Sequence, residues 1–519
     1  MPTLDWIGKA AVVNHHREVP TRLLHCDGAL SAGDADAGNL LVEGDNLEAL
    51  KALLPYYAGQ VKCIYIDPPY NTGNEGWVYN DNVNSPEIRA WLGKVVGREA
   101  EDLSRHDKWL CMMYPRLRLL REFLREDGII FISIDRYEFH NLKQISDDIF
   151  GNAQHIATLV WKRRGNPDSR NVSGVSEDHE YVLCYGRSAL SKFKGAERDT
   201  TKYTNPDNDP RGPWMSDNLT GLAGPKERPN LHYDVVNPAT GLEYSPHPTR
   251  GWAVANSTMG RLIVESRILW PKAATGRPRL KRFQADIQSE FTGFSSILNA
   301  PTNEVGTKEI NQLFGDKVFA FPKPTEFVKA LIRQATAEGD LVLDSFAGSG
   351  TTGVAADRME GGRRFVLVEL DPQIARTVTA ERLRRSDLNS GFRYCTLGKP
   401  LFDEWGTISE GVSYADLAAF VFFSDTGSPI PAKASGDSSL LGTFQSRAVH
   451  LLWSAESAGF ANAVAGNVLT AEVLASLPKP SPQFDGAAAV YGEGCTVTPE
   501  RLAAAGVSFK QIPYQVIGA

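Results

Sequence analysis

The sequence predicts an α/β fold built around a mostly parallel sheet, and three observations support that prediction. Apolar, β-branched segments alternate with helical segments through residues 39–190, and the alternation resumes at residues 316–400. Two of the expected strands also run directly into distinctive turns, DPPY after residue 66 and DSFAGSGTTG after residue 343. Open α/β sheets bind ligands at the carboxyl ends of their strands, so both turns are candidate sites.

The remaining elements can be placed in chain order. Residues 1–38 are expected to form an arm that ends in a Gly/Ala/Asp-rich stretch. The polar segment 71–108 contains Trp77 and Tyr79, and its length predicts a functional loop because compact domains rarely hold such long connections. We expect strands at residues 40–42, 61–66, 129–134, 156–161, 181–185, 340–343 and 365–370, and helices that include residues 47–54, 109–125, 141–150 and 326–337.

Two further segments lie outside this α/β rhythm. Residues 191–315 break into short pieces rich in Pro, Gly, Asn and Arg, which predicts an inserted irregular domain. Residues 401–519 are rich in Ala, Ser and Gly but end in a strand at 487–491, a helix capped by Thr498, and a strand at 507–516. A small C-terminal α/β domain is therefore expected.

Composition limits the class of protein. The 519 residues, 42% hydrophobic and 23% charged, predict a globular protein of several domains. The sequence lacks an apolar run long enough for a membrane span and an apparent signal peptide, which predicts a cytoplasmic location. Six scattered cysteines predict reduced thiols and no metal site. The net charge of -7 hides an asymmetry, because residues 161–290 hold 20 Lys and Arg against 15 Asp and Glu, whereas residues 401–519 hold 5 against 11.

The DPPY turn suits a flat group that carries an amine. Pro68 and Pro69 fix the backbone and remove two donors, so their carbonyls face outward as acceptors. The Asp67 carboxylate and the Pro68 carbonyl can accept hydrogen bonds from an exocyclic amine while the Tyr70 ring stacks on the base. A strand that simply ends in an Asp-Pro turn would account for the same residues without any ligand.

The second turn indicates a cofactor that contains a nucleoside. Gly348 and Gly350 let the backbone approach a ligand closely. Glu369 ends the next strand, 19 residues beyond Gly350, where nucleotide-binding folds place a carboxylate for the ribose. A tight strand-to-helix turn explains the glycines but not this spacing. A phosphate-binding P-loop is excluded, because Thr351 and Thr352 stand where that motif needs its lysine.

Together the two turns carry a family resemblance. FxGxG followed by an acidic strand end resembles the S-adenosylmethionine site of class I methyltransferases, and DPPY resembles the catalytic motif of amino-group DNA methyltransferases. The order, DPPY first with a variable insert between, resembles the circularly permuted beta group. The segments GDNLEAL, YIDPPYNTG, YND, MMYPRL, DGIIFISID, LDSFAGSGTTG and GFRY are similar to the modification (Mod) subunits of type III restriction systems and their orphan relatives.

This resemblance implies a Rossmann-like class I methyltransferase fold and a set of site residues. Residues 39–190 would form the catalytic half of the core, 191–315 a target recognition insert, 316–400 the cofactor-binding half, and 401–519 an acidic domain for a dimer or partner. Catalysis would fall to Asp67, Pro68, Pro69 and Tyr70, and S-adenosylmethionine binding to Asp45, Lys323, Pro324, Asp344, Phe346, Gly348, Gly350 and Glu369. Helix capping would account for Asp45 equally well. The candidate DNA contacts are Lys162, Arg163, Arg164, Arg277, Arg279, Lys281 and Arg282.

The predicted activity is site-specific transfer of a methyl group from S-adenosylmethionine to N6 of an adenine flipped out of double-stranded DNA. Hydrogen bonds to Asp67 and Pro68 would make the amine more nucleophilic for direct in-line displacement. The expected partners are DNA, a second copy of the chain and a restriction or helicase subunit, in a restriction-modification or phage-defence system. Cytosine N4 stays open as the target, as does a main role in DNA recognition within a larger complex. A further alternative is methylation of RNA or of a protein amide.

Overall fold

The computed structural model describes residues 4–34, 37–72, 93–94, 104–169, 174–273, 275–386, 388, 390–454, 461–464 and 466–512. Contacts divide the chain into two compact units, one of Met1–Lys194 with Ser295–Ala519 and the other of Gly195–Phe294. Trp77 and Tyr79, expected to lie in a loop near the DPPY turn, fall outside the described residues.

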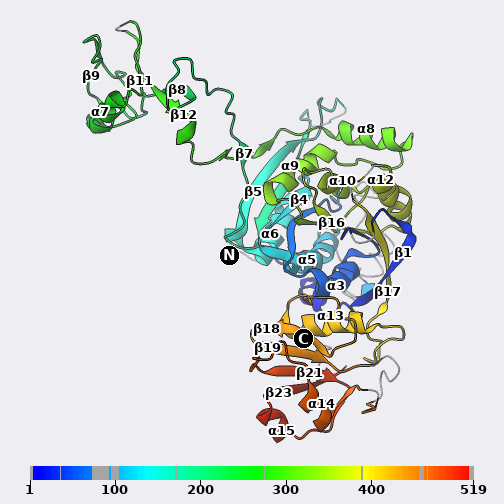
Figure 1. Ribbon diagram of the computed structural model, residues 1–519. Helices are drawn as coiled ribbons and strands as arrows, with labels where there is room; N and C mark the ends of the chain where they lie inside the picture. The colour runs from blue at the N-terminus through cyan, green and yellow to red at the C-terminus, as the bar shows by residue number, and fades with distance from the viewer. Residues whose placement is uncertain are drawn as a thin grey trace. The chain divides into compact units, whose positions relative to one another are not determined.

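A ten-stranded sheet organises the larger unit (Figure 1). Its strands are β1 (Arg22–Ala32), β2 (Leu40–Glu43), β3 (Val61–Ile66), β4 (Leu124–Ile134), β5 (His155–Lys162), β6 (His179–Gly186), β14 (Ile297–Leu298), β15 (Leu341–Asp344), β16 (Arg364–Glu369) and β17 (Phe392–Pro400). They lie in the order β1-β17-β2-β16-β15-β3-β4-β6-β5-β14. The six strands from β17 to β4 are parallel, whereas β1 and β6 run antiparallel to their neighbours.

Helices cover both faces of this sheet (Figure 1). Side chains alternate along β3, so Ile64 and Ile66 join the core of one face while Tyr65 meets Phe327 on the other, with ring centroids 6.3 Å apart. On the first face lie α3 (Asn46–Tyr57), α5 (Arg105–Phe123) and α6 (Phe139–Ser146), and on the second α9 (Thr325–Ala335), α10 (Thr351–Asp357) and α12 (Ala380–Arg385). The other helices of the core are α1 (Lys9–Val12), α2 (His15–Glu18), α8 (Asn303–Phe314) and α11 (Pro372–Ile374), with a 3-10 turn at Asn152–Gln154 and π-helical turns at Asp147–Gly151 and Ala375–Thr379.

The sheet has a topological switch point between β3 and β15. From β3 the chain continues outward to β4, and from β15 it continues in the opposite direction to β16. The two strands are parallel neighbours, with Leu343 paired to Ile64. A switch point opens a crevice beyond the carboxyl ends of the strands, and both turns singled out in the sequence begin there.

The boundaries of the insert differ from those expected. The predicted insert of residues 191–315 corresponds to the compact unit Gly195–Phe294, whereas residues 295–315 contribute β14 and α8 to the larger unit. The smaller unit packs a core around Trp252, Leu219 and Met259. Its elements are β7 (Ala196–Glu197), β8 (Trp214–Asn218), β9 (Val235–Val236), β10 (Glu243–Tyr244), α7 (Asn256–Val264), β11 (Ile268–Leu269), β12 (Arg279–Phe283), β13 (Phe291–Thr292) and 3-10 turns at Pro229–Leu231 and Gln284–Asp286.

Both ends of the chain are regular. The expected N-terminal arm contains two short helices and contributes β1 to the edge of the large sheet. In the C-terminal part, four strands form a sheet in the order β18-β19-β21-β23. The elements there are α13 (Tyr414–Thr426), β18 (Leu440–Phe444), β19 (Arg447–Leu451), β20 (Val468–Leu469), α14 (Ala471–Ser476), β21 (Ala488–Gly492), β22 (Gly494–Cys495), α15 (Pro499–Ala504) and β23 (Val507–Gln511). The strand and helix expected at residues 487–491 and after Thr498 are therefore present as β21 and α15. The strand expected at residues 507–516 is present as β23, and residues 513–516 lie outside the described ranges.

The prediction that all cysteines are reduced is wrong for one pair. Cys26 of β1 and Cys395 of β17 are register partners in the sheet and form a disulfide, with Cα atoms 4.0 Å apart. They lie 369 residues apart in sequence, so spacing could not have paired them. Cys63, Cys111, Cys184 and Cys495 are free. Within the described ranges, no helix combines the length and apolar character that a membrane crossing requires.

Candidate active site

Four carboxylates gather along one edge of the sheet because each follows a parallel strand. Asp45 comes after β2, Glu369 ends β16, Asp344 ends β15, and Asp67 follows β3. Carboxyl ends of adjacent parallel strands meet at the same edge, so the fold alone brings these four together. The sequence-predicted catalytic turn and cofactor turn are therefore neighbours.

Asp67 lies at the centre of a compact polar cluster. Its Oδ1 accepts a hydrogen bond from the Tyr70 hydroxyl at 2.7 Å, and its Oδ2 accepts one from Lys323 Nζ at 2.7 Å. Burial raises the pKa of Asp67, although the Lys323 ammonium works in the opposite direction. The carboxylate therefore stands in an environment where its charge is poorly solvated and available to a donor.

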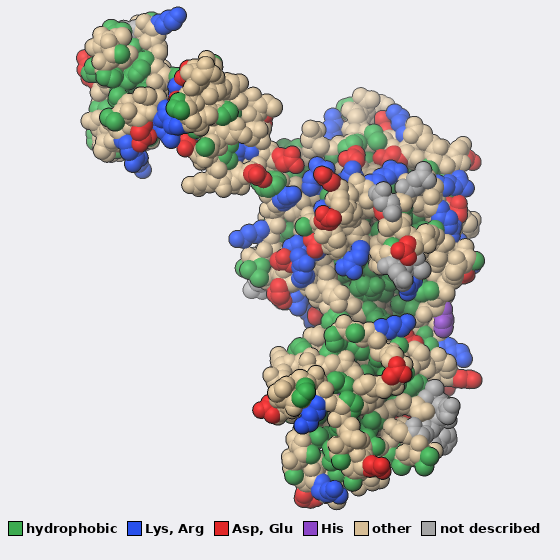
Figure 2. All heavy atoms as spheres, viewed as in Figure 1, with side chains coloured by type: hydrophobic (Ala, Val, Ile, Leu, Met, Phe, Trp, Pro, Cys, Tyr) green, Lys and Arg blue, Asp and Glu red, His purple; other side chains and the backbone are tan. Residues whose placement is uncertain are grey.

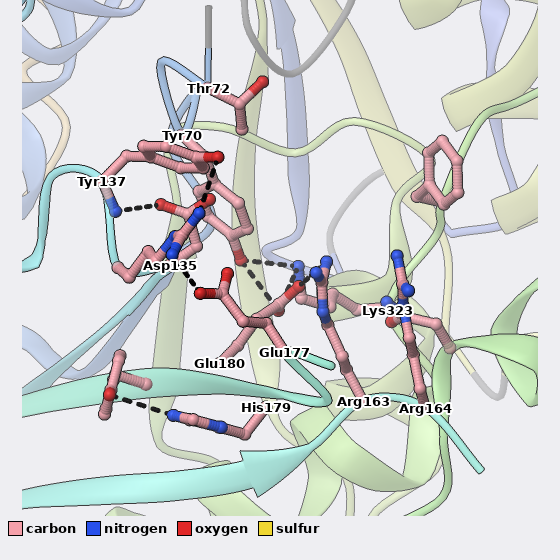
Figure 3. A pocket seen from close by; sticks show the side chains of 14 residues that line it. Tyr70, Thr72, Asp135, Tyr137, Arg163, Arg164, Glu177, His179, Glu180 and Lys323 are labelled. Carbon is pink, nitrogen blue, oxygen red and sulfur yellow. Dashed lines mark hydrogen bonds and ion pairs between the residues drawn. The ribbon is translucent and has the colours of Figure 1, made fainter. Parts of the chain in front are cut away.

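Glu180, which sequence reasoning did not identify, completes this cluster. It is buried on β6, and its Oε2 lies 3.1 Å from the Tyr70 hydroxyl and 3.4 Å from Lys323 Nζ. Its Oε1 accepts a hydrogen bond from Arg163 Nη1 at 3.2 Å. Figure 3 shows the side chains of Tyr70, Glu180, Lys323 and Arg163 pointing toward one another. A charged residue at the start of an otherwise apolar strand was the available signal.

A cavity of about 370 Å³ opens beside this cluster. The rings of Tyr70, Tyr137, Tyr181 and Phe321 contribute to its wall, and charged and polar side chains form the rest of the lining. Aromatic rings beside converging polar groups are typical of a site for a flat ligand with polar edges. The lining residues are Tyr70, Thr72, Asp135, Arg136, Tyr137, Arg163, Arg164, Glu177, His179, Glu180, Tyr181, Asn303, Phe321 and Lys323.

The backbone of the DPPY turn is held from behind. The Trp109 indole donates to the Pro69 carbonyl at 2.7 Å, which leaves the Pro68 carbonyl as the acceptor that the prediction assigns to the amine. Asn71 follows with a positive φ of 56° and donates both to the Arg105 carbonyl, at 3.1 Å, and to the buried Glu138 carboxylate. These contacts fix the turn that presents Asp67 and Tyr70.

A second, smaller cavity of about 30 Å³ lies at the glycine-rich turn. Asp67, Asp344, Phe346 and Gly348 line it together with Phe321 and Lys323, which also line the larger cavity. Lys323 was predicted to serve the cofactor, and the structure places it where the two cavities meet. Gly348 and Gly350 have φ values of 52° and 78°, a conformation that favours glycine.

Asp344 differs from Asp67 in the donors around it. Thr352 donates its hydroxyl to Oδ2 and the Phe346 amide donates to Oδ1 at 2.9 Å, so both of these partners are neutral. Burial raises the pKa of Asp344 to about 7. Neither of these two donors neutralises the Asp344 carboxylate, so a cation in this cavity could pair with it.

The two remaining carboxylates also shape the turn. Glu369 accepts hydrogen bonds from the Gly348 amide at 2.8 Å and the Asp371 amide at 2.9 Å. Asp45 caps α3, with Oδ1 accepting from the amides of Leu47 and Glu48, while Oδ2 pairs with Arg116 at 2.7 Å. One oxygen of Asp45 is thus used to cap the helix and the other to pair with Arg116. Its contact with the cofactor stays a prediction. Pro324 precedes α9 as its N-cap residue.

The predicted DNA-binding residues are split between the two units. In the larger unit, Lys162 is exposed, and Arg163 and Arg164 line the large cavity. In the smaller unit, Arg277 is exposed, Arg279 donates to Ser216, Arg282 pairs with Asp217 at 3.0 Å, and Lys281 is buried between Asp207 and Asp209. Figure 2 shows Lys and Arg side chains interleaved with acidic ones at the surface of this unit. Their contacts with DNA stay predictions.

Comparison with known proteins defines the class of enzyme. Residues 61–381 match the DNA methylase family of N6 and N4 methyltransferases, and the chain belongs to that family. It is 32% identical over 475 residues to the type III restriction-modification enzyme StyLTI Mod subunit of Salmonella typhimurium, an alignment that covers 80% of this chain and 71% of the relative. The chain is therefore a DNA methyltransferase that uses S-adenosylmethionine.

Other relatives fall in the same class. The chain is 32% identical to the EcoP15I Mod subunit of Escherichia coli, over 71% of this chain and 64% of the relative. It is also 32% identical to the type II methyltransferase M.KpnI of Klebsiella pneumoniae, over 70% of this chain and 86% of that one. A solved structure of the cytosine-N4-specific PvuII DNA methyltransferase is 15% identical over 68% of this chain and 87% of its own, with a TM-score of 0.35.

The residues present fit this cofactor. S-adenosylmethionine carries a sulfonium and an ammonium group, and Asp344 offers a carboxylate whose recorded donors are neutral. Positive φ at residues 348 and 350 favours glycine, and glycine adds no side chain that a cofactor would meet.

Proposed function

We propose that this chain methylates N6 of adenine at a specific short sequence in double-stranded DNA. The observation that carries the proposal is the position of Asp67, Tyr70 and Lys323 between a ring-lined cavity and the cofactor turn. A base in the larger cavity would present its amine to Asp67 and, beyond it, to the methyl donor. The base must leave the duplex to reach this position.

The residues of the chain act mainly by orientation and electrostatics. S-adenosylmethionine, when bound, supplies an electrophilic methyl group. Asp67 and the Pro68 carbonyl accept the two amine hydrogens and turn the nitrogen lone pair toward that group. The Asp67 carboxylate also stabilises the positive charge that develops on the nitrogen, and it does so strongly because burial limits its solvation. The Tyr70 ring stacks on the base.

DNA contacts and partners extend the same proposal. Arg277, Arg279 and Arg282 of the Gly195–Phe294 unit would contact phosphates or bases, and Lys162 would contact the backbone near the cavity. Two of the named relatives are subunits of type III restriction-modification enzymes, which supports a restriction subunit as a partner. The complex would also hold a second copy of this chain. We place the protein in the cytoplasm, in a restriction-modification or phage-defence system.

The test is methyl transfer by the purified chain to unmethylated plasmid DNA, followed by digestion and mass spectrometry of the nucleosides. N6-methyladenine is the expected product. N4-methylcytosine would retain the site and mechanism but overturn the choice of base. Absence of any methylated base, in a protein shown by calorimetry to bind S-adenosylmethionine, would contradict activity of the isolated chain and direct the assay to its complex with a partner.

A further inference from the structure

Glu180 is a buried carboxylate in the reaction cluster that the mechanism above does not use. It is 2% exposed, and it reaches the cluster from β6 rather than from either predicted turn. Arg163 holds its Oε1 at 3.2 Å, so the carboxylate is fixed with Oε2 toward Tyr70 and Lys323. A buried charge kept in contact with reacting groups calls for a reason beyond packing.

The Tyr70 hydroxyl has two acceptors within reach but only one hydrogen. Asp67 Oδ1 lies 2.7 Å away and Glu180 Oε2 lies 3.1 Å away. Lys323 Nζ, at 2.9 Å, donates to the hydroxyl oxygen. The single hydroxyl hydrogen can therefore be donated to only one of the two carboxylates at a time. Rotation about the C–O bond is enough to transfer this hydrogen bond between the carboxylates.

Both oxygens of the Asp67 carboxylate already accept hydrogen bonds before a base arrives. Tyr70 donates to one of its oxygens and Lys323 to the other. Both donors draw on the negative charge that the target amine needs, and both lower the pKa of Asp67 against the larger effect of burial. A stronger acceptor would result if one donor could move elsewhere without loss of its hydrogen bond.

We propose that Glu180 is a positioning residue that takes over the Tyr70 hydroxyl when the target amine reaches Asp67. Oδ1 of Asp67 then accepts the amine hydrogen with its full charge, and no buried donor is left unsatisfied. Lys323 stays in place between the two carboxylates and balances their charge throughout. This inference rests on the proposed function, because it assigns Glu180 a role in the same transfer.

The first test is Glu180→Gln, which keeps the shape of the side chain and removes its charge. The single-turnover rate should fall by about tenfold or more, because a neutral amide is a weaker acceptor for Tyr70. The acid limb of the rate against pH should also move to lower pH, because the negative charge of Glu180 raises the pKa of Asp67. A residue that only fills space would leave the limb where it is.

The second test is Tyr70→Phe, which keeps the stacking ring and removes the hydroxyl. The hydrogen bond from Tyr70 lowers the pKa of Asp67, so this change should move the acid limb to higher pH, opposite to Glu180→Gln. In the Tyr70→Phe background, Glu180→Gln should slow transfer by no more than about twofold, since no hydroxyl remains to be handed over.

The matched control is Glu126→Gln. This carboxylate lies on β4, is 70% exposed, and pairs with Arg187 at 3.8 Å beyond the opposite end of β6. We expect its rate and pH profile to match the wild type. Circular dichroism and S-adenosylmethionine affinity show whether each variant is folded. If Glu180→Gln does not fold, Glu180→Asp keeps the charge but shortens the reach to Tyr70; the proposal expects slower transfer with little shift of the acid limb, and an unchanged rate would overturn it.

The outcomes separate the inference from the proposed function. No methylation by the wild-type chain, either alone or in complex with a partner, contradicts the proposed function itself. Normal methylation by the wild type, with unchanged pH limbs in both variants, overturns only the role of Glu180. Equal slowing by Glu180→Gln with and without the Tyr70 hydroxyl also overturns it, because Glu180 would then act independently of that group.

Discussion

Lys323 and Lys281 are both buried between pairs of carboxylates, and they belong to different compact units. Lys323 is 7% exposed, with Nζ 2.7 Å from Asp67 and 3.4 Å from Glu180. Its ammonium lies 5.0 Å from the centroid of the Tyr70 ring. This cluster belongs to the predicted catalytic turn and faces the cavity of about 370 Å³.

Lys281 has nearly the same local pattern. It is 8% exposed, pairs with Asp207 and Asp209, and lies 4.9 Å from the centroid of the Trp214 ring. Asp207, however, is 44% exposed, and the hydrogen bond from Lys281 lowers its pKa. The cluster connects β12 to the loop before β8 and so stabilises the fold of this unit.

The difference lies in the surroundings of the carboxylates rather than in the lysines. Asp209 is only 7% exposed, but it also pairs with Arg211 at 2.8 Å, and the hydrogen bond from Arg211 lowers its pKa. Burial raises the pKa of Asp67 even though Lys323 contacts it, whereas Asp207 is exposed and its charge is readily satisfied. A poorly solvated carboxylate gains from a new donor, and a well-solvated one does not. The same residue types can thus form a candidate reactive site in one unit and a structural ion-pair cluster in the other.

The largest effect should come from Asp67→Ala. Loss of the carboxylate removes the acceptor for the amine and the charge that stabilises the transition state, so transfer should fall by about 10³-fold or more. S-adenosylmethionine affinity, measured by calorimetry, should stay close to that of the wild type because Asp344 and the glycine turn are unchanged. Comparable transfer rates in the two proteins would refute the catalytic assignment.

Lys323→Met sharpens the comparison at the same site. Without the ammonium, Asp67 loses the cation that lowers its pKa, so this pKa should rise further and the acid limb of the transfer rate should move to higher pH. We expect a fall in rate of about 10²-fold at neutral pH. A pH–rate profile checks both effects, and an unmoved acid limb would show that Lys323 does not control Asp67.

The Asp344 carboxylate accepts hydrogen bonds from two neutral groups, Thr352 and the Phe346 amide. Its effect on cofactor affinity should be smaller than the effects above on the transfer rate. Because its pKa is raised to about 7, the group ionises as pH rises through neutrality, and the ionised form favours a cationic cofactor. The affinity for S-adenosylmethionine should increase by about tenfold from about pH 6 to about pH 8. Calorimetry over this pH range tests the prediction. The affinity of Asp344→Asn should not change with pH, and an affinity that does not change with pH in the wild type would contradict the role given to Asp344.

The smallest effects should distinguish the basic residues of the insert. Arg277→Ala should weaken DNA binding a few-fold and reduce the salt slope by about 1, because an exposed guanidinium can release a counterion. Lys281→Met should change the salt slope little and act instead on the thermal stability of its unit. Fluorescence anisotropy across salt concentrations compares the two variants, and a larger slope change for Lys281→Met would show that its ion-pair cluster opens on DNA.

Much of the fold and half of the site follow from local sequence. Asp67, Tyr70, Asp344 and Glu369 could be found because each follows an apolar strand directly, and parallel strands bring such residues to one edge. Glu180 could not be assigned in this way, since it enters from an antiparallel strand 110 residues beyond Tyr70. Its contact depends on the order of the strands in the sheet.

The basic insert shows a second limit of sequence reasoning. Lys281 and Arg282 were candidate DNA contacts, but Lys281 is paired with Asp207, 74 residues earlier in the chain, and Arg282 with Asp217. Charge counts do not reveal such pairs, because they depend on how β12 and β8 align. The Cys26–Cys395 disulfide was missed for the same reason.

The most direct test of the central claim is single-molecule sequencing of DNA from cells that express the wild-type chain or Asp67→Ala. Our account predicts N6-methyladenine at one short sequence motif in the wild-type sample and its absence in the variant sample. Methylation at that motif in both samples would contradict the assignment of the reaction to Asp67 and to the cluster around it.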